Sequence, residues 1–225
     1  ESDTTIGIRS KEQKIEQKIK NVLVNSGLSE IYTYGFVSDK DLEKSKINKD
    51  LKETSILIQN PLSDEYKLMR PSTIPSMMQT LATNANKKNS SAKLFDISKS
   101  YKNINNEVEN GEVPLQENIL TIGMYGDDID FYTVKGLIEN VLETSSINRY
   151  DIVRETENES YHTGRCANFK VGIDVIATIG EVHPEVLDNY GIEKRAYLAE
   201  INLTKITKYS KANKKYVEVP KFPAV

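Results

Sequence analysis

Residues 57–98 constrain the fold most strongly, because differently patterned segments follow one another there in quick succession. An apolar, β-branched run at 55–59 stops at Asn60 and Pro61, a dipeptide that favours a turn and keeps Asn60 out of the helical region. Apolar residues then recur at the spacing of one helical face between 74 and 85, with Pro75 suited to a first turn. Residues 93–98 alternate like a half-buried strand. The pattern predicts a strand, a turn, a helix and a strand.

The residues at the joints of these segments narrow the fold further. Asn-Pro-Leu-Ser at 60–63 is followed by Leu-Met-Arg at 68–70, a predicted helix to Asn84, and Leu-Phe-Asp-Ile-Ser at 94–98. This order resembles the catalytic-like module in the β subunit of bacterial phenylalanyl-tRNA synthetase, whose second strand is Leu-Phe-Glu-Ile-Gly. Asp96 and Ser98 depart from that pattern. The resemblance implies an α+β, class II aminoacyl-tRNA synthetase-like fold, with a mainly antiparallel sheet flanked by helices.

The overall composition excludes several classes of protein. The 225 residues suffice for one large domain or two small ones. The 30 basic and 33 acidic residues give a net charge of -3, which does not favour a nucleic-acid-binding module. No apolar run approaches the roughly 20 residues that span a bilayer, and no signal peptide opens the sequence. One cysteine, Cys166, excludes an internal disulfide, so we expect a cytoplasmic protein without a membrane partner.

The two ends of the sequence lead us to expect a piece of a larger polypeptide. The sequence begins at Glu1 without methionine and stops in an apolar run that contains Pro223. We interpret residues 1–218 as the catalytic-like domain, with its core at about 10–210. Residues 219–225 resemble the start of the family's linker to a C-terminal domain of the anticodon-binding type.

The first third of the chain resembles the subunit-interface element of class II synthetases. Ser10 and Gln13 have the spacing of a capping box, and apolar residues at helical spacing follow as far as Leu23, with Gly27 as the expected left-handed residue after the helix. Residues 31–37 are rich in aromatic and β-branched residues, which predicts a strand. A helix followed by a Tyr-x-Phe strand resembles motif 1 of the class. The resemblance therefore makes three residues candidates for the interface: Tyr32, Tyr34 and Phe36.

Further matches to the family are spread over the second half of the chain. Residues 99–118 are polar and predict a long connection, and 119–125 predict a strand. Asp130 opens a predicted amphipathic helix whose Lys-Gly pair resembles the family. Tyr-His-Thr-Gly-Arg-Cys-Ala at 161–167 resembles a His-Pro-Gly-Arg-Ser-Ala motif, and 167–182 predict a hairpin. The resemblance marks these positions as structural: Asn60, Pro61, Asn84, Phe95, Asp96, Lys135, Gly136, Glu181, His183 and Pro184.

The chemistry expected of an active class II site is not supported by the sequence. Joining a carboxylate to the α-phosphate of ATP requires cations at fixed positions, usually arginines with magnesium. The family's catalytic subunits carry one arginine two positions before a glutamate on the motif 2 strand and another in a glycine-rich motif 3. The corresponding segments here, 94–97 and 200–207, contain neither arginine. We therefore predict no catalytic residues in this chain.

Arg70 and Arg165 are the remaining candidates for binding an anion. The alternative is that each anchors a turn by bonding to carbonyls or to a carboxylate such as Asp64 or Asp96. His162, His183 and Cys166 have no spacing that indicates a metal site, so we predict none. We also expect this chain to bind no cofactor of its own.

The resemblance implies a non-catalytic module at a subunit interface of phenylalanine-tRNA ligase. Its partner would be the α subunit in an α2β2 enzyme that attaches phenylalanine to tRNA(Phe) with ATP and Mg²⁺. The excised chain would be able to self-associate through the bare interface. Two alternatives stay open, an autonomous class II-type ATP-dependent ligase and a tRNA-binding module.

Overall fold

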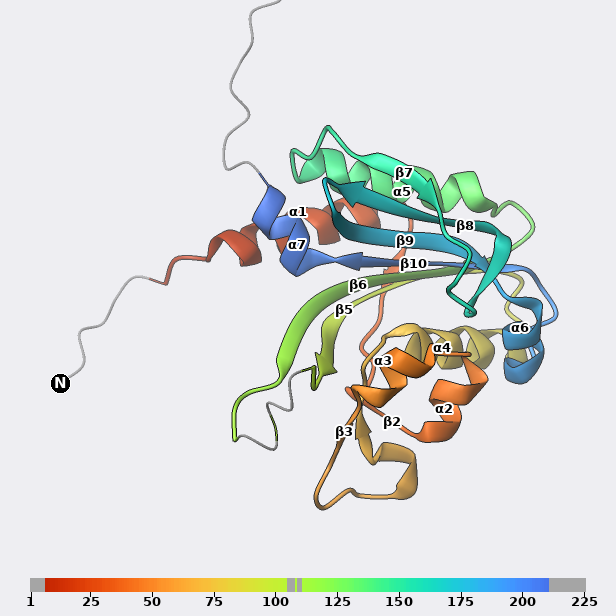
Figure 1. The fold of residues 1–225 in the computed structure, drawn as a ribbon. Helices are drawn as coiled ribbons and strands as arrows, with labels where there is room; N and C mark the ends of the chain where they lie inside the picture. The colour runs from red at the N-terminus through yellow and green to blue at the C-terminus, as the bar shows by residue number, and fades with distance from the viewer. Residues whose placement is uncertain (1–6, 105–107, 109–110, 211–225) are drawn as a thin grey trace, which may run out of the picture.

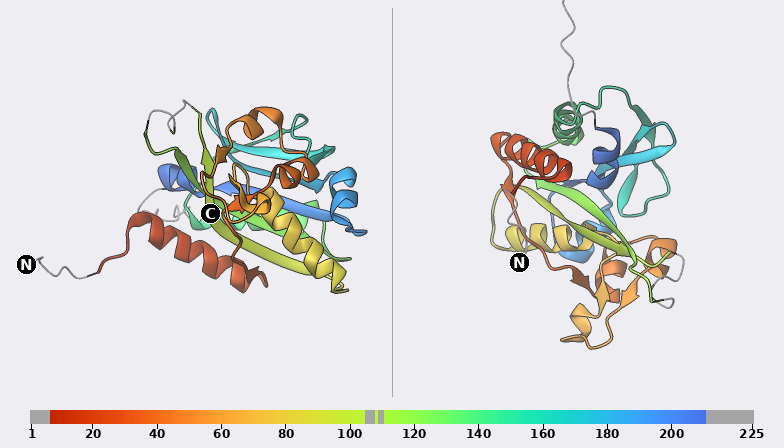
Figure 2. Two further views of the ribbon diagram at one scale, coloured as in Figure 1. Left: turned by 90° about the horizontal axis from the view of Figure 1, so that it is seen from below. Right: turned by 90° about the vertical axis from the view of Figure 1, so that its left-hand side faces the viewer.

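A seven-stranded sheet runs through the molecule and carries helices on both of its faces (Figures 1 and 2). The structure is a computed structural model, and it describes residues 7–104, 108 and 111–210. The predicted linker at 219–225 lies outside the described residues. The strand order is β1-β5-β6-β10-β9-β8-β7, and every neighbouring pair is antiparallel except β1 with β5. The prediction of an α+β fold with a mainly antiparallel sheet is confirmed.

The two strands β5 and β6 form the longest ladder of this sheet. β5 (Ala92–Lys102) and β6 (Leu115–Tyr125) pair over their full lengths, from Ala92 opposite Tyr125 to Lys102 opposite Leu115. The remaining strands of the sheet are β1 (Ser29–Glu30), β7 (Asp151–Arg154), β8 (Tyr161–Val171), β9 (Asp174–Val182) and β10 (Ala196–Asn202). The predicted hairpin at 167–182 is confirmed and begins earlier than expected, at Tyr161.

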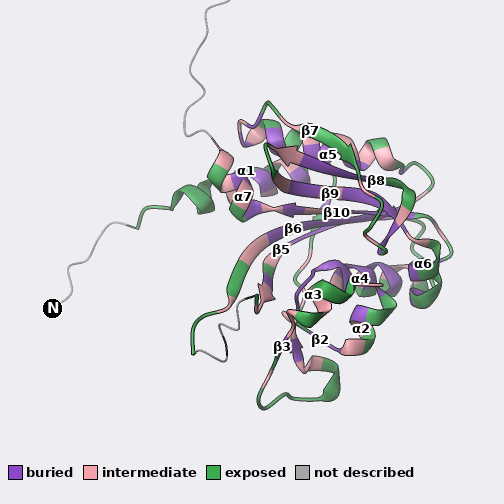
Figure 3. Ribbon diagram, in the orientation of Figure 1, coloured by how far each residue is buried: buried purple, intermediate pink, exposed green. Residues whose placement is uncertain are grey.

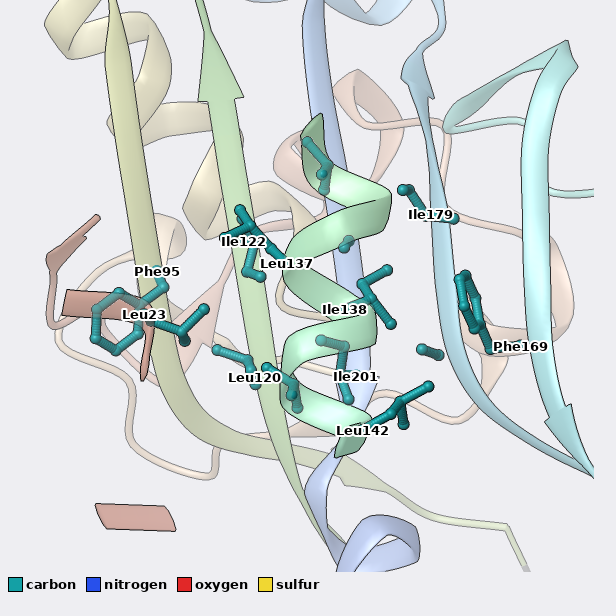
Figure 4. Packing of buried hydrophobic residues seen from close by; sticks show 14 of the residues in the cluster. Leu23, Phe95, Leu120, Ile122, Leu137, Ile138, Leu142, Phe169, Ile179 and Ile201 are labelled. Carbon is teal, nitrogen blue, oxygen red and sulfur yellow. The ribbon is translucent and has the colours of Figure 1, made fainter. Parts of the chain in front are cut away.

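One face of the sheet is covered by three helices. These are α1 (Lys11–Asn25), α5 (Phe131–Thr144) and α7 (Leu203–Tyr209). Their apolar stripes meet strand residues in a cluster of fully or nearly fully buried side chains. Figure 4 shows Ile138 and Leu142 of α5 lying among side chains of the strands, including Ile201 and Phe169. Burial on this face is close to complete, and we call it the sealed face (Figure 3).

The opposite face carries α4 (Ile74–Asn86) and α6 (Pro184–Tyr190). A second apolar cluster joins them to the sheet, with Met77, Met78 and Leu81 of α4 at its centre. Gly123 permits this close packing, because a Cβ there would lie 2.5 Å from Met77 Cγ. Gly180 has a similar role, since a Cβ would lie 2.6 Å from Tyr161 Cδ1.

A small three-stranded sheet lies beside α4 (Figure 1). It consists of β2 (Phe36–Val37), β4 (Leu68–Met69) and β3 (Ile56–Leu57), with β4 in the middle and antiparallel to both neighbours. The connections contain α2 (Asp39–Lys44), α3 (Lys49–Glu53) and the 3₁₀ turn η1 (Asp64–Tyr66). A minor core of Val37, Leu42 and Leu68 holds this unit together.

The predicted ends of several helices are confirmed in atomic detail. Ser10 and Gln13 form the expected capping box at α1, and Gly27 has the expected positive φ of 84°. Asp130 caps α5 by accepting a hydrogen bond from the Thr133 backbone. Pro184 occupies the first turn of α6, and Gly191 ends it in the left-handed conformation. These ends depend on neighbouring residues only, which is why the sequence shows them.

Two predicted strands and one predicted connection differ in extent from the structure. The predicted strand at 31–37 is divided, with β1 ending at Glu30 and β2 beginning at Phe36. The apolar run at 55–59 contributes only Ile56–Leu57 as strand, which pairs with β4 at Leu68–Met69. The predicted connection at 99–118 is shorter, because both of its ends belong to strands. Polar pairs across those strands explain this: Lys99 donates to Gln116, and Lys102 to Glu117, both at 2.9 Å.

Among the described residues, no helix is long and apolar enough to cross a membrane.

Candidate subunit interface

The three predicted interface aromatics lie exposed on the segment that joins the two sheets. Tyr32 is 85% exposed, Tyr34 73% and Phe36 40%. The segment leaves the main sheet where the Ile31 amide donates to the Phe95 carbonyl, and it joins the small sheet where Phe36 pairs with Met69. Between these points Thr33 points inward, and its hydroxyl donates to Asp96 Oδ2 at 2.5 Å. The structure therefore places apolar rings in solvent on a segment that is fixed at both ends.

Arg70 holds this segment against the sheet from within. Its side chain is buried, and Nη1 donates to Thr33 Oγ1 at 2.6 Å and to the Tyr34 carbonyl at 3.1 Å. Its Nε donates to the Lys99 carbonyl at 2.9 Å, and its backbone amide donates to the Gly35 carbonyl at 3.0 Å. One residue thus connects the segment to β5. The structure shows Arg70 bonded to protein carbonyls and hydroxyls, with Asp96 at 3.8 Å.

A groove of about 900 Å³ opens next to the exposed aromatics. Tyr32, Tyr34 and Phe36 line it together with α2 and η1, and Tyr66 of η1 packs edge-on against Tyr34 at a ring separation of 5.7 Å. The remaining wall is one stripe of α4 formed by Pro75, Ser76, Gln79 and Thr80. The groove is built from segments far apart in the sequence, so no local motif predicts it.

Two rows of side chains cross the face of the main sheet that carries α4. The register places Leu94, Gly123, Leu198, Gly180 and Cys166 side by side. Two residues further along each strand, and so on the same face, lies what we call the polar row. Its members are Asp96, Thr121, Glu200, Thr178 and Asn168. Apolar side chains of α4 and α6 cover the first row. The polar row lies outside this apolar cluster.

Hydroxyl and amide groups form hydrogen bonds with the polar row, and Asp96 also forms an ion pair with Arg70 at 3.8 Å. Glu200 Oε1 accepts hydrogen bonds from Ser72 Oγ at 3.1 Å and Thr73 Oγ1 at 2.8 Å. Thr178 donates to Asn168 at 2.7 Å. Within the described part of the chain, Arg70 is the only basic residue in an ion pair or hydrogen bond with the row or its bound hydroxyls. Burial lowers the pKa of Arg70 from its ordinary value, and Asp96 opposes that change.

Leu94, two residues before Asp96, is the residue that the resemblance aligns with the motif 2 arginine of the family's catalytic subunits. It lies in the apolar cluster with Met77 and Leu81 of α4. The segment at 200–207 forms the end of β10 and the start of α7, without a glycine or an arginine. The face that the resemblance associates with class II chemistry is therefore apolar at Leu94 and carries carboxylates at Asp96 and Glu200.

Arg165 and Glu181 form an ion pair on the other face of the sheet, where Glu181 lies opposite Tyr197. Arg165 Nη1 donates to both carboxylate oxygens of the largely buried Glu181, each at 2.7 Å. His162 accepts a hydrogen bond from the Gly164 amide, and His183 accepts one from the Glu185 amide. Each histidine therefore stabilises the backbone two residues after it. Burial raises the pKa of Cys166 to about 12, which makes its thiolate inaccessible at neutral pH. No group of metal-binding side chains occurs among the residues that the structure describes.

The other positions marked by the resemblance occupy varied environments. Asn60 and Pro61 lie in an exposed turn, and Asn84 accepts from Asn89 at the end of α4. Phe95 is fully buried on the sealed face. Lys135 pairs with Glu139 one turn along α5, and a Cβ at Gly136 would meet nothing within 4 Å. Sequence reasoning did not find Thr33 or Glu200, whose partners are distant in sequence, although both are polar residues within apolar segments.

The fold is that of a class II aminoacyl-tRNA synthetase catalytic domain. The pyrrolysyl-tRNA synthetase of Desulfitobacterium hafniense has a similar solved structure, with a TM-score of 0.70 and 14% sequence identity over 92% of this chain and 75% of that one. A second structure of that enzyme gives a TM-score of 0.69, with 15% identity over 86% of this chain and 66% of that one. At these identities the comparison establishes the fold alone.

The sequence comparisons identify the particular family. Residues 1–203 match the model of the phenylalanyl tRNA synthetase beta chain CLM domain, and the chain belongs to that family. It is 40% identical to the phenylalanine–tRNA ligase beta subunit of Clostridium acetobutylicum over 96% of this chain and 27% of that protein. The corresponding subunit of Clostridium tetani is also 40% identical, over 95% of this chain and 26% of that protein. The chain thus spans about a quarter of the length of these relatives.

Proposed function

We propose that this chain is a non-catalytic module that forms a subunit interface in phenylalanine–tRNA ligase. Its partner is the catalytic α subunit, and the assembled cytoplasmic α2β2 enzyme attaches phenylalanine to tRNA(Phe) with ATP and Mg²⁺. The module itself binds neither ATP nor Mg²⁺. The observation that carries the proposal is the fixed and exposed aromatic segment at 32–36, which presents rings to solvent although Arg70 holds its backbone in place.

The energetics of this segment support an interface. Large apolar side chains are less stable in water than when they are buried. A partner that covered them would stabilise the complex by roughly 25 cal/mol per Å² of apolar surface removed from water. A segment that is already ordered also loses little conformational entropy when it binds. Aromatic side chains are enriched at the buried centres of protein interfaces. The exposed aromatic residues would therefore stabilise a complex in which a partner buries them, whereas they contribute no such burial in the isolated chain.

The polar row supports the absence of catalysis. The transition state of adenylate formation concentrates negative charge, which needs cations placed before the reaction starts. Asp96 and Glu200 place carboxylates on that face, and Arg70 is committed to Thr33, Tyr34 and Lys99. Both ATP and the product would meet electrostatic repulsion there.

Pyrophosphate exchange tests the catalytic half of the proposal. The chain is incubated with ATP, Mg²⁺, phenylalanine and labelled pyrophosphate, and the α2β2 enzyme of the same organism serves as the positive control. We expect exchange by the chain at the background of a reaction without protein. Exchange above that background that disappears in an Asp96→Ala or Glu200→Ala variant would overturn the proposal in favour of an autonomous ligase.

A further inference from the structure

Residues of the aromatic segment at 32–36 alternate between the protein and solvent. Tyr32, Tyr34 and Phe36 are exposed, and the residues between them, among them Thr33, are half-buried. Successive side chains of an extended chain point in opposite directions, so an inward Thr33 turns both neighbouring tyrosines outward. Whatever holds Thr33 in place therefore also sets the direction of Tyr32 and Tyr34.

The backbone in the middle of this segment is not held by a neighbouring strand. Hydrogen bonds between backbones occur on either side of it, from the Ile31 amide to the Phe95 carbonyl at 2.8 Å and from the Arg70 amide to the Gly35 carbonyl at 3.0 Å. Within the part of the chain that the structure describes, residues 32–34 form no backbone-to-backbone hydrogen bond. The direction of these residues therefore depends on contacts that involve side chains.

The Thr33 hydroxyl provides such a contact because it lies between two opposite charges. It accepts a hydrogen bond from Arg70 Nη1 at 2.6 Å and donates one to Asp96 Oδ2 at 2.5 Å, whereas those two charged atoms are 3.8 Å apart. Arg70 and Asp96 are both buried, and Ser98 also donates to Asp96 Oδ2 at 2.8 Å. Hydrogen bonds to charged groups are stronger than those between neutral groups. A hydroxyl that donates and accepts at once is fixed in one direction, and the β-branched side chain restricts its rotamers further.

We infer that Thr33 is a positioning residue, and that Asp96 of the polar row acts through it to keep Tyr32 and Tyr34 directed towards the α subunit. This inference rests on the proposed function and deepens it, because it identifies the contact that orders the binding surface before the partner arrives. A segment ordered in advance loses less conformational entropy on binding. Loss of the Thr33 hydroxyl should therefore weaken binding although every aromatic side chain is retained.

Three substitutions in the complete β subunit that carries this chain test the inference. Thr33→Val removes the hydroxyl and nearly keeps the shape of the side chain, whereas Thr33→Ser keeps the hydroxyl. Thr178→Val is the matched control, because Thr178 belongs to the same polar row and donates to Asn168 at 2.7 Å. Two members of the row lie between Thr178 and Asp96, so the control removes a hydroxyl that has no part in holding the aromatic segment.

Chymotrypsin measures how well the segment is held, because it cleaves after exposed tyrosines in chain that opens locally. The rate of cleavage after Tyr34 is followed by mass spectrometry and divided by the rate for a synthetic peptide with the same substitution. We expect this ratio to rise about tenfold in Thr33→Val, since the hydroxyl's bonds to two charged groups are lost. Cleavage after Tyr125, which is buried in β6, reports unfolding of the whole domain and should stay slow. If Thr33→Val does not fold, Thr33→Ala is measured in its place.

Binding to the α subunit is measured on the same variants. We expect the dissociation constant to rise about fivefold or more in Thr33→Val, because the segment must be ordered when the partner binds. Thr33→Ser should restore both cleavage and binding to within about twofold of the original β subunit. Thr178→Val should change neither.

The outcomes separate this inference from the proposed function. Unchanged cleavage after Tyr34 in Thr33→Val would show that the hydroxyl does not hold the segment. An equal increase after Tyr125, or in Thr178→Val, would show that the hydroxyl acts only through overall stability, and the inference would be wrong. Faster cleavage after Tyr34 with unchanged binding would also overturn the inference and leave the proposed function standing. If the original β subunit forms no complex with the α subunit, the proposed function fails, and cleavage alone decides whether Thr33 orders the segment.

Discussion

The two faces of the main sheet differ in how completely their side chains are buried. The sealed face is an apolar cluster of α1, α5, α7 and the strands, and its central side chains have no access to solvent. On the opposite face, an apolar row lies under α4, and the polar row lies two residues further along each strand. A groove with exposed aromatic side chains lies next to α4. β5 shows the contrast in two adjacent residues, since Phe95 is buried in the first cluster and Asp96 belongs to the polar row.

The difference shows which parts of the molecule maintain the synthetase-like fold. The fold depends on the sealed face and on the rows covered by α4 and α6. The polar row adds no comparable apolar burial, and its contribution depends on keeping its buried polar groups hydrogen-bonded. Substitutions on the two faces should therefore change the free energy of unfolding by different amounts and affect different properties of the molecule.

The largest expected effect is on the sealed face. Phe169→Ala removes a fully buried ring that packs against Tyr150, at a centroid distance of 5.5 Å. We expect the free energy of unfolding to fall by about 4 kcal/mol. Urea denaturation measures it, and Ile173→Ala, at a side chain that is 97% exposed, should stay within about 0.5 kcal/mol of the original chain. Similar losses at both sites would mean that the sealed face does not carry the stability.

The next effect concerns Arg70, which connects the aromatic segment to β5. Arg70→Met leaves the Tyr34 and Lys99 carbonyls without their donor and removes the cation nearest to Asp96. We expect a loss of about 3 kcal/mol in the free energy of unfolding, together with faster hydrogen exchange at residues 32–36. The control is Arg154→Met on the exposed edge strand β7. Unchanged exchange at 32–36 would contradict the role of Arg70 in holding the aromatic segment.

A pair of glycine substitutions compares close packing with open space. Gly180→Ala places a Cβ 2.6 Å from Tyr161 Cδ1 and 3.0 Å from the Arg165 carbonyl oxygen, and should destabilise the chain by about 2 kcal/mol. Gly136→Ala, in the interior of α5 with nothing within 4 Å, should stabilise it by about 0.5–1 kcal/mol. Thermal unfolding of the two variants measures both signs. Destabilisation by Gly136→Ala would show that α5 has a close neighbour at that position.

The smallest effect is a dependence of stability on pH at the end of the β5–β6 hairpin. Burial raises the pKa of Glu117, but the hydrogen bond and charge of Lys102 outweigh it, so the pKa lies below its ordinary value of 4.5. A lowered carboxyl pKa contributes stability above the ordinary value, and that stability is lost as the pH falls through the lower folded value. Unfolding free energies measured from pH 6 to pH 3 should therefore fall less in Glu117→Gln than in the original chain. Parallel curves would contradict this.

The sequence predicts those parts of the molecule whose causes are local. The capping box of Ser10, the left-handed Gly27 and Gly191, and the β8–β9 hairpin all depend on residues within a few positions. The division of the segment at 31–37 was missed because its partners, Phe95 and Met69, are far away in the chain. The exposed aromatics could be named in advance, but the groove could not, because α2, η1 and α4 meet only in the folded chain.

The central claim is that the aromatic segment is where the α subunit binds. Light scattering after size exclusion measures this directly, on the chain alone and mixed with the α subunit of the same organism. We predict a stoichiometric complex that Tyr34→Glu weakens at least tenfold, whereas Tyr132→Glu, at an aromatic side chain 75% exposed on α5, leaves it unchanged. A complex that is equally strong in both variants would contradict the claim.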